Sequence, residues 1–438
     1  MLQNVDIDIH HLTRVEGHGN IVVNVSNGTI ETCEWQVPEN PRFFEAMVRG
    51  RHYSEVARIT SRICGICAVG HTLASVTATE AALGIEVTPQ TRALRTILKH
   101  AENFDSHTVH VHVLVAPDLF GAPSIFPLIP THGEVVVRAL RLKRMSHEWG
   151  SLIGGRTTHP VTVVPGGFTS LPSARDLKAM RDRLIEAVPD LEGTAETILS
   201  VADKLPAFDR PTEYMAVHED GQYGLFAGSV ETILADGDRA RYDIKDYLDI
   251  TNEFMVPQST AKHTKNRLGS YAAGALARFN VNYDQLHPEA KRIAEKLGLA
   301  PICTNPYMNS VAQVVECVHA VYESVRLIDE LLEVGIVEEG LVQPTRFASG
   351  ISAVEVPRGI LYHEYSYDDD GLCTEANCII PTNQNHGNIQ ADFDELLPQL
   401  IAAGASEDEM ALKLSMLVRA YDPCISCSTH YLDVSFVR

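Results

Sequence analysis

The sequence predicts a mostly helical α+β fold, with a core of long bundled helices and small β-sheets at the periphery. Apolar residues from Val311 to Leu332 recur every three to four positions, which predicts a long amphipathic helix that ends at Gly335. A second helical pattern covers residues 93–115, whereas apolar and polar side chains alternate near the N-terminus as they do in short strands. The chain has 438 residues, of which 45% are hydrophobic, so it can bury a large core built from two or three packed subregions.

The N-terminal region predicts a β-hairpin. Apolar residues alternate along residues 5–9 and 21–25, and Ser26-Asn27-Gly28 forms a turn signal before the apolar run 30–35. The loop between the first two strands, residues 11–19, contains Arg, Glu and His beside glycines. Such a loop is either an ordinary solvated turn or part of a site.

Helical patterns dominate the next third of the chain. We expect a short helix over residues 41–51, a buried helix over 67–83 and a long helix over 93–115 that ends at Pro117-Asp118. His100, His107 and His110 have helical spacing on the long helix, and we interpret them as core or interface residues.

A Gly- and Pro-rich stretch, residues 119–172, predicts a buried or partner-facing loop region around a helix at 135–152. Ser173 is then a plausible N-cap for a helical segment that Pro206 closes. Near the end of the chain, residues 411–421 predict a closing helix. We treat the chain as one unit with an N-terminal β-hairpin region (1–36), a helical core (42–206 and 262–338), a peripheral lobe (207–261) and a C-terminal metal-binding region (339–438).

Composition excludes several classes of partner. A net charge of −21 disfavours nucleic acid and anionic lipid, which bind clustered Lys and Arg. The sequence has nine cysteines, no signal peptide and no apolar run of eighteen residues, so we expect a cytoplasmic protein with reduced thiols and no membrane span.

Two Cys-x-x-Cys motifs stand at opposite ends of the chain. The first is Cys64 to Cys67 and the second is Cys424 to Cys427. Each places two thiols on one turn, where they can bind one metal ion or form a disulfide. A four-cysteine zinc site is one reading, although its halves usually lie roughly 15–20 residues apart. A thioredoxin-like pair needs a βαβ context, and buried inert cysteines are a third reading.

These cysteine motifs belong to a wider set that resembles the large subunit of a nickel–iron hydrogenase, and the resemblance runs from end to end. Strings such as Asn40 to Ala46 and His71 to Ser75 resemble most the soluble cytoplasmic branch, which includes methyl-viologen-reducing and nicotinamide-coupled enzymes. The set comprises Arg14-x-Glu16-Gly17-His18, Glu45, Arg62-x-Cys64-x-x-Cys67-x-x-x-His71, Pro357-Arg358-Gly359, Pro381-Thr382 and Asp422-Pro423-Cys424-x-x-Cys427-x-x-His430.

The resemblance implies the large-subunit fold and the reversible splitting of H2 into protons and electrons. Soft thiolates suit nickel. By resemblance, Cys64 and Cys424 are terminal nickel ligands, whereas Cys67 and Cys427 bridge to an iron that carries CO and cyanide. Heterolytic cleavage also needs a nearby base, and the resemblance gives Glu16, beside Cys424, this proton-carrying role.

Further roles are implied around the metals. Arg358 would place its guanidinium over their open side, and Asp118 would orient it. The backbone at Arg358 and the hydroxyl of Thr382, which follows Pro381, would donate hydrogen bonds to the cyanides, and His71 would hydrogen-bond a bridging thiolate. A Mg²⁺ site is implied at Glu45, His430 and the main-chain carbonyl of Cys378.

Electrons must leave through another subunit. The five remaining cysteines lack the spacing of an iron–sulfur cluster, so we expect an iron–sulfur small subunit docked near the first cysteine pair and residues 159–167. Further electron-transfer subunits of iron–sulfur, flavin or heterodisulfide-reductase type are also expected. Family precursors are usually cleaved after the histidine that corresponds to His430, yet residues 431–438 follow here. The alternative is a non-catalytic subunit that holds zinc in the same cysteines and serves as an assembly platform.

Overall fold

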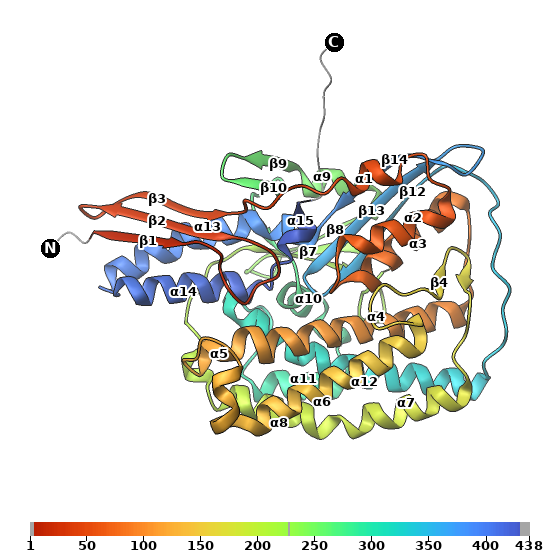
Figure 1. Cartoon of the computed structure of the whole chain (residues 1–438), viewed down its shortest axis with the longest axis horizontal. Helices are drawn as coiled ribbons and strands as arrows, with labels where there is room; N and C mark the ends of the chain where they lie inside the picture. Colours follow the sequence, from red (N-terminus) through yellow and green to blue (C-terminus); the bar gives the residue numbers. More distant parts are fainter. Residues whose placement is uncertain (1–3, 227, 430–438) are drawn as a thin grey trace, which may run out of the picture.

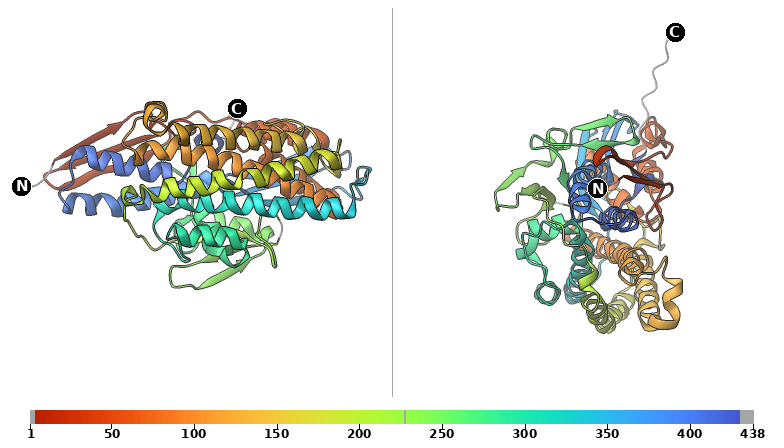
Figure 2. Two further views of the ribbon diagram at one scale, coloured as in Figure 1. Left: turned by 90° about the horizontal axis from the view of Figure 1, so that it is seen from below. Right: turned by 90° about the vertical axis from the view of Figure 1, so that its left-hand side faces the viewer.

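The structure is a computed structural model that describes residues 4–226 and 228–429. Long helices lie side by side in its lower half, and the sheets lie above them (Figure 1). Seen from below, these helices run along the longest axis of the molecule (Figure 2). The predicted helical core with peripheral sheets is confirmed. The bundle consists of α4 (Pro89–Val109), α6 (Ile129–Gly154), α7 (Ala174–Glu186), α8 (Val188–Leu199) and α12 (Asn309–Val334).

The helix ends follow local chemistry. The Ser173 side chain accepts a hydrogen bond from the Asp176 N–H, so the predicted N-cap of α7 is confirmed. Helix α12 ends at Gly335, also as predicted. Thr88 caps α4 in the same way, with proline at the first helical position, where a missing N–H removes no helical bond.

The long helix after α4 continues further than the sequence predicts. It passes through a π-helical segment, His110–Val115, into α5 (Ala116–Leu119). Pro117 does not end it, because a proline in the first turn of α5 has no partner there to lose. The helix therefore reaches Leu119.

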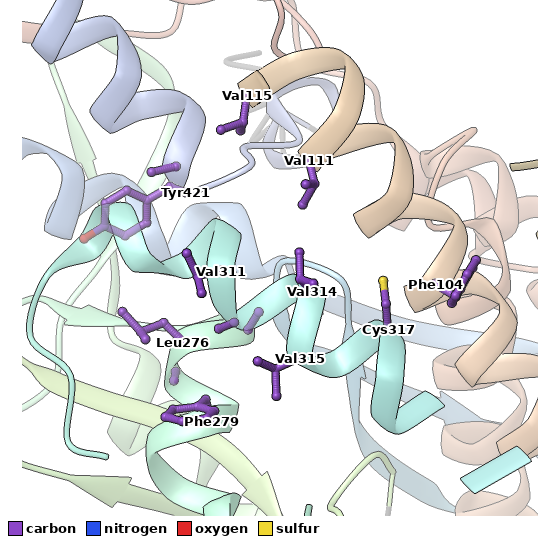
Figure 3. Close-up of a cluster of buried hydrophobic side chains, with 14 of the residues drawn as sticks. Phe104, Val111, Val115, Leu276, Phe279, Val311, Val314, Val315, Cys317 and Tyr421 are labelled. Carbon is purple, nitrogen blue, oxygen red and sulfur yellow. The ribbon is translucent and has the colours of Figure 1, made fainter. Parts of the chain in front are cut away.

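Packing between α4 and α12 forms the centre of the core. Phe104 of α4 lies in one hydrophobic cluster with Val314 and Cys317 of α12, and Val111 and Val115 of the π-helical segment extend this cluster (Figure 3). Cys317 is buried among them, as expected for a core residue.

The N-terminal sheet is an antiparallel meander of β1 (Val5–Ile9), β2 (Asn20–Ser26) and β3 (Thr29–Gln36). Asn27 and Gly28 both have positive φ, as the predicted tight turn between β2 and β3 requires. This sheet lies against two C-terminal helices, α13 (Pro381–Ala402) and α14 (Glu407–Ala420) (Figure 1). The two ends of the chain are thus packed together.

A second antiparallel sheet contains β12 (Ser349–Val356), β13 (Gly359–Tyr367) and β14 (Cys373–Ile379). Its strands pack on α3 (Ala68–Leu83), the buried helix that the sequence predicts after the first cysteine pair. Smaller helices complete the molecule: α1 (Phe44–Val48), α2 (Tyr53–Thr60), α9 (Tyr247–Thr251), α10 (Ala275–Asn282), α11 (Pro288–Lys296) and α15 (Ile425–Ser428).

The predicted lobe contains β6 (Glu213–His218), β7 (Ser229–Ile233) and β8 (Arg239–Tyr242), and β9 (Glu253–Val256) pairs with β10 (Ser259–Thr264). Strand β6 is almost entirely buried and pairs in parallel with β11 (Tyr271–Ala272). Its sheet therefore extends past the predicted boundary at residue 261. A short hairpin, β4 (Val163–Val164) with β5 (Gly167–Phe168), follows α6.

Within the described part of the chain, every helix is too short or too polar to span a lipid bilayer.

The bundle histidines are core residues, as predicted. Loss of hydration by burial lowers the pKa of His100 to about 3 and those of His112 and His319 to about 4. An unfolded chain takes up a proton on each histidine near pH ~6.5. Between these values the unfolded state binds more protons, so stability is complete above this range and falls as the pH decreases.

We expect the free energy of unfolding to fall between pH 7 and 5, by on the order of 1–2 kcal/mol for each fully buried histidine. His319→Gln cannot take up the proton and should reduce the fall. His10→Gln, whose native side chain is 67% exposed, should leave it unchanged. Urea denaturation at each pH measures the effect, and equal falls in His319→Gln and the wild type would contradict the explanation.

Candidate metal centre

The four motif cysteines converge on one buried point. The Cys64 and Cys424 sulfurs lie 3.5 Å apart, and those of Cys67 and Cys427 lie 3.8 Å apart. All four sulfurs lie within 4.8 Å of one another, and none of the four residues is more than 5% exposed. All nine cysteines of the chain are free thiols. The predicted convergence of the two motifs is confirmed.

Local structure presents each pair on a tight turn. Cys64 follows a 3-10 turn at Ser61–Ile63, and its sulfur accepts hydrogen bonds of 3.2 Å from the N–H groups of Ile66 and Cys67. Cys424 is the N-cap residue of the short helix α15, and Cys427 lies within this helix.

Arg42 ties the two turns together. Its Nη2 donates 2.8 Å to the Ile63 carbonyl and also donates to the Ser426 carbonyl. One guanidinium thus fixes the distance between motifs from opposite ends of the chain.

The four thiols of the cluster differ in how readily they ionise. Hydrogen bonds from neighbouring thiols, above all Cys424, hold the pKa of Cys64 well below its usual range. Burial raises the pKa values of Cys424 and Cys427 well above theirs. Four thiolates this close repel one another, so a bound cation is required to keep all of them deprotonated.

The guanidinium of Arg358 lies close to the cysteine cluster, and one of its nitrogens has no hydrogen-bond partner among the described residues. Its Nη2 donates 2.8 Å to the Asp422 carboxylate, and its Nε donates to the Asp422 carbonyl. Its Nη1 is buried and has no hydrogen-bond partner among the described residues. Burial alone would lower the pKa of Arg358, but the charges of Asp422, Cys424, Cys67 and Cys64 outweigh it and raise the pKa further.

The predicted contact between Asp118 and Arg358 is wrong. Asp118 instead pairs with Arg14 and, at 2.9 Å, with Arg419. The carboxylate on Arg358 is Asp422, because the chain reverses there with φ of 49° and carries this residue beneath the guanidinium. Asp118 therefore anchors the loop that leads to Glu16.

Glu16 lies against the second cysteine motif, as predicted. Its backbone pairs with Cys424, its carbonyl accepts 3.0 Å from the Ile425 N–H, and its carboxylate accepts 3.1 Å from the Ser426 N–H. Gly17 has φ of +86°, and a Cβ there would lie 2.7 Å from the Ile425 Cβ. Only glycine fits this close approach.

Thr382 and His71 come from different elements, α13 and α3. The Thr382 hydroxyl accepts 3.0 Å from the Cys424 N–H and retains its own proton for donation. It follows Pro381 at the start of α13. His71 lies one turn into α3 after Cys67, and its Nδ1 is 3.2 Å from the His363 Nε2.

The structure also brings two of the three predicted Mg²⁺ ligands together. The Glu45 carboxylate accepts 2.8 Å from the Cys378 N–H. The Arg42 N–H donates 2.7 Å to the Thr429 carbonyl. The chain just before His430 therefore lies next to the start of α1, the helix that carries Glu45. His430 itself, like the tail 431–438, lies outside the described residues.

The sequence did not predict a buried ion-pair network that holds the backbone next to Arg358; we call it the Arg278 clamp. Arg278 donates to Glu316 at 2.6 and 2.7 Å, to Glu355 at 2.8 Å, and to the carbonyls of Val356 and Pro357 at 2.8 and 3.0 Å. All five of its N–H groups are used. These bonds hold the segment that carries Arg358, yet no local motif marks the three charged residues.

Fold and site define a class of protein in which four buried cysteines, two from each end of the chain, form one group that could hold a metal ion. The family model of nickel-dependent hydrogenase matches residues 42–127 and 258–430. The chain is 32% identical to sulfhydrogenase 2 subunit alpha of Pyrococcus furiosus over 98% of this chain and 100% of that protein. It is 29% identical to the NAD-reducing hydrogenase HoxS subunit beta of Cupriavidus necator, over 97% and 94%.

Solved structures of hydrogenases have the same fold as this chain. A chain of the NAD+-reducing [NiFe]-hydrogenase in the H2-reduced state matches with a TM-score of 0.88 and 26% identity, over 97% of this chain and 99% of that one. The Ni-Fe-Se hydrogenase from D. vulgaris Hildenborough shares the fold, with a TM-score of 0.77 and 22% identity over 98% and 100%. The chain belongs to the nickel-dependent hydrogenase family and is an oxidoreductase that acts on hydrogen.

Removing the Arg278 charge should destabilise the protein strongly. Arg278→Met leaves Glu316 and Glu355 buried without their counter-ion, which we expect to cost about 3–5 kcal/mol of unfolding free energy. Arg326→Met is the control, because that arginine is 45% exposed and pairs with Glu323 at the surface. Urea denaturation measures both variants, and a loss below about 1 kcal/mol for Arg278→Met would contradict the clamp.

Proposed function

We propose that this chain is the catalytic subunit of a nickel–iron hydrogenase, in which Cys64, Cys67, Cys424 and Cys427 hold a Ni–Fe centre that splits H2 reversibly into protons and electrons. The convergence of four sulfurs within 4.8 Å carries the proposal, since it brings two motifs 360 residues apart into one buried group of thiols. Soft thiolates favour nickel and iron over hard cations. When bound, the centre supplies the Lewis acidity that polarises H2.

The surrounding residues fit such a centre with CO and cyanide ligands. The buried Nη1 of Arg358 needs an acceptor, and a cyanide on the iron would satisfy it. The Thr382 hydroxyl beside Pro381 offers a second donor. By resemblance to the family, Cys64 and Cys424 would be the terminal ligands and Cys67 and Cys427 the bridging ones; the two sulfurs of each pair lie 3.5 and 3.8 Å apart.

Protons leave through Glu16. Its backbone lies beside Cys424, and a half-buried carboxylate there can receive a proton from the cysteine sulfur and release it outward. Arg14 and Asp118 hold the loop in place. Asp118 is thus a positioning residue for Glu16.

A Mg²⁺ site belongs to the same proposal. The Glu45 carboxylate, which lies beside Cys378, and the Cys378 carbonyl would supply oxygen ligands of the kind that Mg²⁺ prefers. His430 would be a ligand by resemblance to the family, and waters would complete the set.

The electron acceptor is an iron–sulfur small subunit. Among the described residues, the four motif cysteines form the one group that could share a metal ion, so no second cluster is available to carry electrons onward. The surface beside Cys64 is suited to docking, because Ile66 is 39% exposed and Val161 51% exposed there. The His159 Nδ1 lies 3.0 Å from the Ser61 carbonyl, so the segment that carries Val161 is attached close to the first cysteine motif. Further electron-transfer subunits and a cytoplasmic location complete the proposal.

Cys427→Ser tests the centre itself. A serine hydroxyl is a hard, weakly ionised ligand, so we expect at least about half of the metal to be lost. Cys303→Ser, which changes a half-buried cysteine outside the cluster, should keep it. Elemental analysis of the purified complex measures both. One nickel and one iron per wild-type chain supports the enzyme, whereas one zinc and neither of these metals would support an assembly platform.

Glu16→Gln tests the proton route. The amide keeps the shape of the carboxylate but cannot carry a proton, so exchange of hydrogen isotopes between gas and water should slow by about 100-fold or more at unchanged metal content. Glu34→Gln in strand β3 is the half-buried control. Wild-type exchange in Glu16→Gln would remove this residue from the route.

A further inference from the structure

A buried polar ladder joins α3 to β13 and begins beside the cysteine cluster. His363, Tyr365 and Tyr367 alternate along β13 and therefore share one face of the strand. His71 and Thr79 lie two turns apart on the facing side of α3. The outermost contact, between the hydroxyls of Thr79 and Tyr367, is 2.7 Å long.

The inner contacts form a continuous chain of three side chains. The His71 Nδ1 lies 3.2 Å from the His363 Nε2, and the His363 Nδ1 lies 2.6 Å from the Tyr365 hydroxyl. The two imidazole rings are 5.4 Å apart with 47° between their planes, and the ring of Tyr365 stands at 89° to that of His363. None of the three residues is more than 1% exposed, so bulk water does not compete for these bonds.

The direction of donation follows from the tyrosine. The Tyr365 oxygen lies 2.6 Å from the His363 Nδ1. A phenol O–H is a stronger donor than a neutral imidazole N–H, and an imidazole nitrogen is a stronger acceptor than a phenol oxygen, so the favoured arrangement has the hydroxyl as the donor. The His363 Nδ1 is then an acceptor, and in the neutral ring Nε2 carries the hydrogen.

The same reasoning passes to His71. Its Nδ1 accepts from the His363 Nε2–H, which leaves the hydrogen of the neutral ring on the His71 Nε2. Side chains of a helix lean toward its N-terminus, so the His71 ring lies over the turn that begins at Cys67. A thiolate-rich cluster favours an N–H donor rather than a lone pair at this position.

We propose that Tyr365 and His363 are positioning residues that fix the tautomer of His71, so that its Nε2–H is held as a donor toward the cysteine sulfurs. The functional consequence rests on the proposed function: a hydrogen bond to a bridging thiolate withdraws electron density from the sulfur and hence from the iron. The relay moves no proton during the reaction. It sets which hydrogen the histidine presents.

Neutron diffraction from deuterated crystals of the complete enzyme reads the tautomer directly. Deuterium should appear on the Tyr365 oxygen, on the His363 Nε2 and on the His71 Nε2. Deuterium on the His71 Nδ1 would overturn the proposal, whatever metal the protein binds.

Tyr365→Phe tests the consequence with a small change. It removes one hydroxyl, frees the His71 tautomer and should lower the infrared stretching frequency of an iron-bound CO, because a more basic thiolate leaves more electron density on the iron. Tyr367→Phe is the matched control, since it also removes a buried hydroxyl that bonds α3, but this hydroxyl bonds Thr79 and no member of the relay. Its CO band should coincide with that of the wild type.

A substituted relay provides a rescue. His363→Gln places an amide N–H near the former Nε2 and should restore the wild-type band, whereas His363→Leu should behave like Tyr365→Phe. An unshifted or raised CO band in Tyr365→Phe would overturn the proposal. If the wild type shows no CO or cyanide bands at all, the proposed function fails, and the neutron result alone decides the relay.

Discussion

The approach of two cysteine turns from opposite ends of the chain is the constraint on which the rest of the structure depends. The sulfurs of Cys64 and Cys424 meet although 360 positions separate them. The N-terminal sheet packs on α13 and α14, and this packing brings the Glu16 loop to Cys424. Arg42 then bonds both turns at once. Glu16 and Thr382 both form hydrogen bonds with the turn that carries Cys424, so their positions depend on this contact between the two motifs.

The charges around the centre are buried, which is expensive unless each group is paired. Arg358 is held by Asp422 from one side, and the Arg278 clamp fixes the backbone just before Arg358 from the other. Burial alone would raise the pKa of Glu316, but Arg278 and His107 outweigh it, and the carboxylate stays charged. The Arg358 Nη1 is one of several buried polar atoms, with the Arg14 Nε and the Arg42 Nε, that have no hydrogen-bond partner in the described part of the chain. An anionic ligand would supply a partner for Nη1.

Local signals predicted much of this from the sequence. The two Cys-x-x-Cys motifs, the Ser173 cap and the Gly335 stop each depend on neighbouring residues, so a linear pattern reveals them. The partner of Arg358 could not be chosen this way, because Asp118 and Asp422 are both carboxylates in suitable places and only the tertiary fold decides between them.

Ion pairs between residues far apart in the sequence could not be predicted either, because they also depend on the tertiary fold. Arg278, Glu316 and Glu355 come from three separate elements and carry no motif, and the π-helical segment after α4 looks like ordinary helix in the sequence. The alternation of His363 and Tyr365 along the strand could be read from the sequence. It does not show that these side chains face His71, because that contact depends on the tertiary fold.

Anomalous scattering from crystals of the purified enzyme, recorded at the absorption edges of nickel and iron, tests the central claim most directly. We predict one nickel peak and one separate iron peak among the sulfurs of Cys64, Cys67, Cys424 and Cys427. A single peak at the zinc edge, with none at the other two, would contradict a hydrogen-splitting centre in this chain.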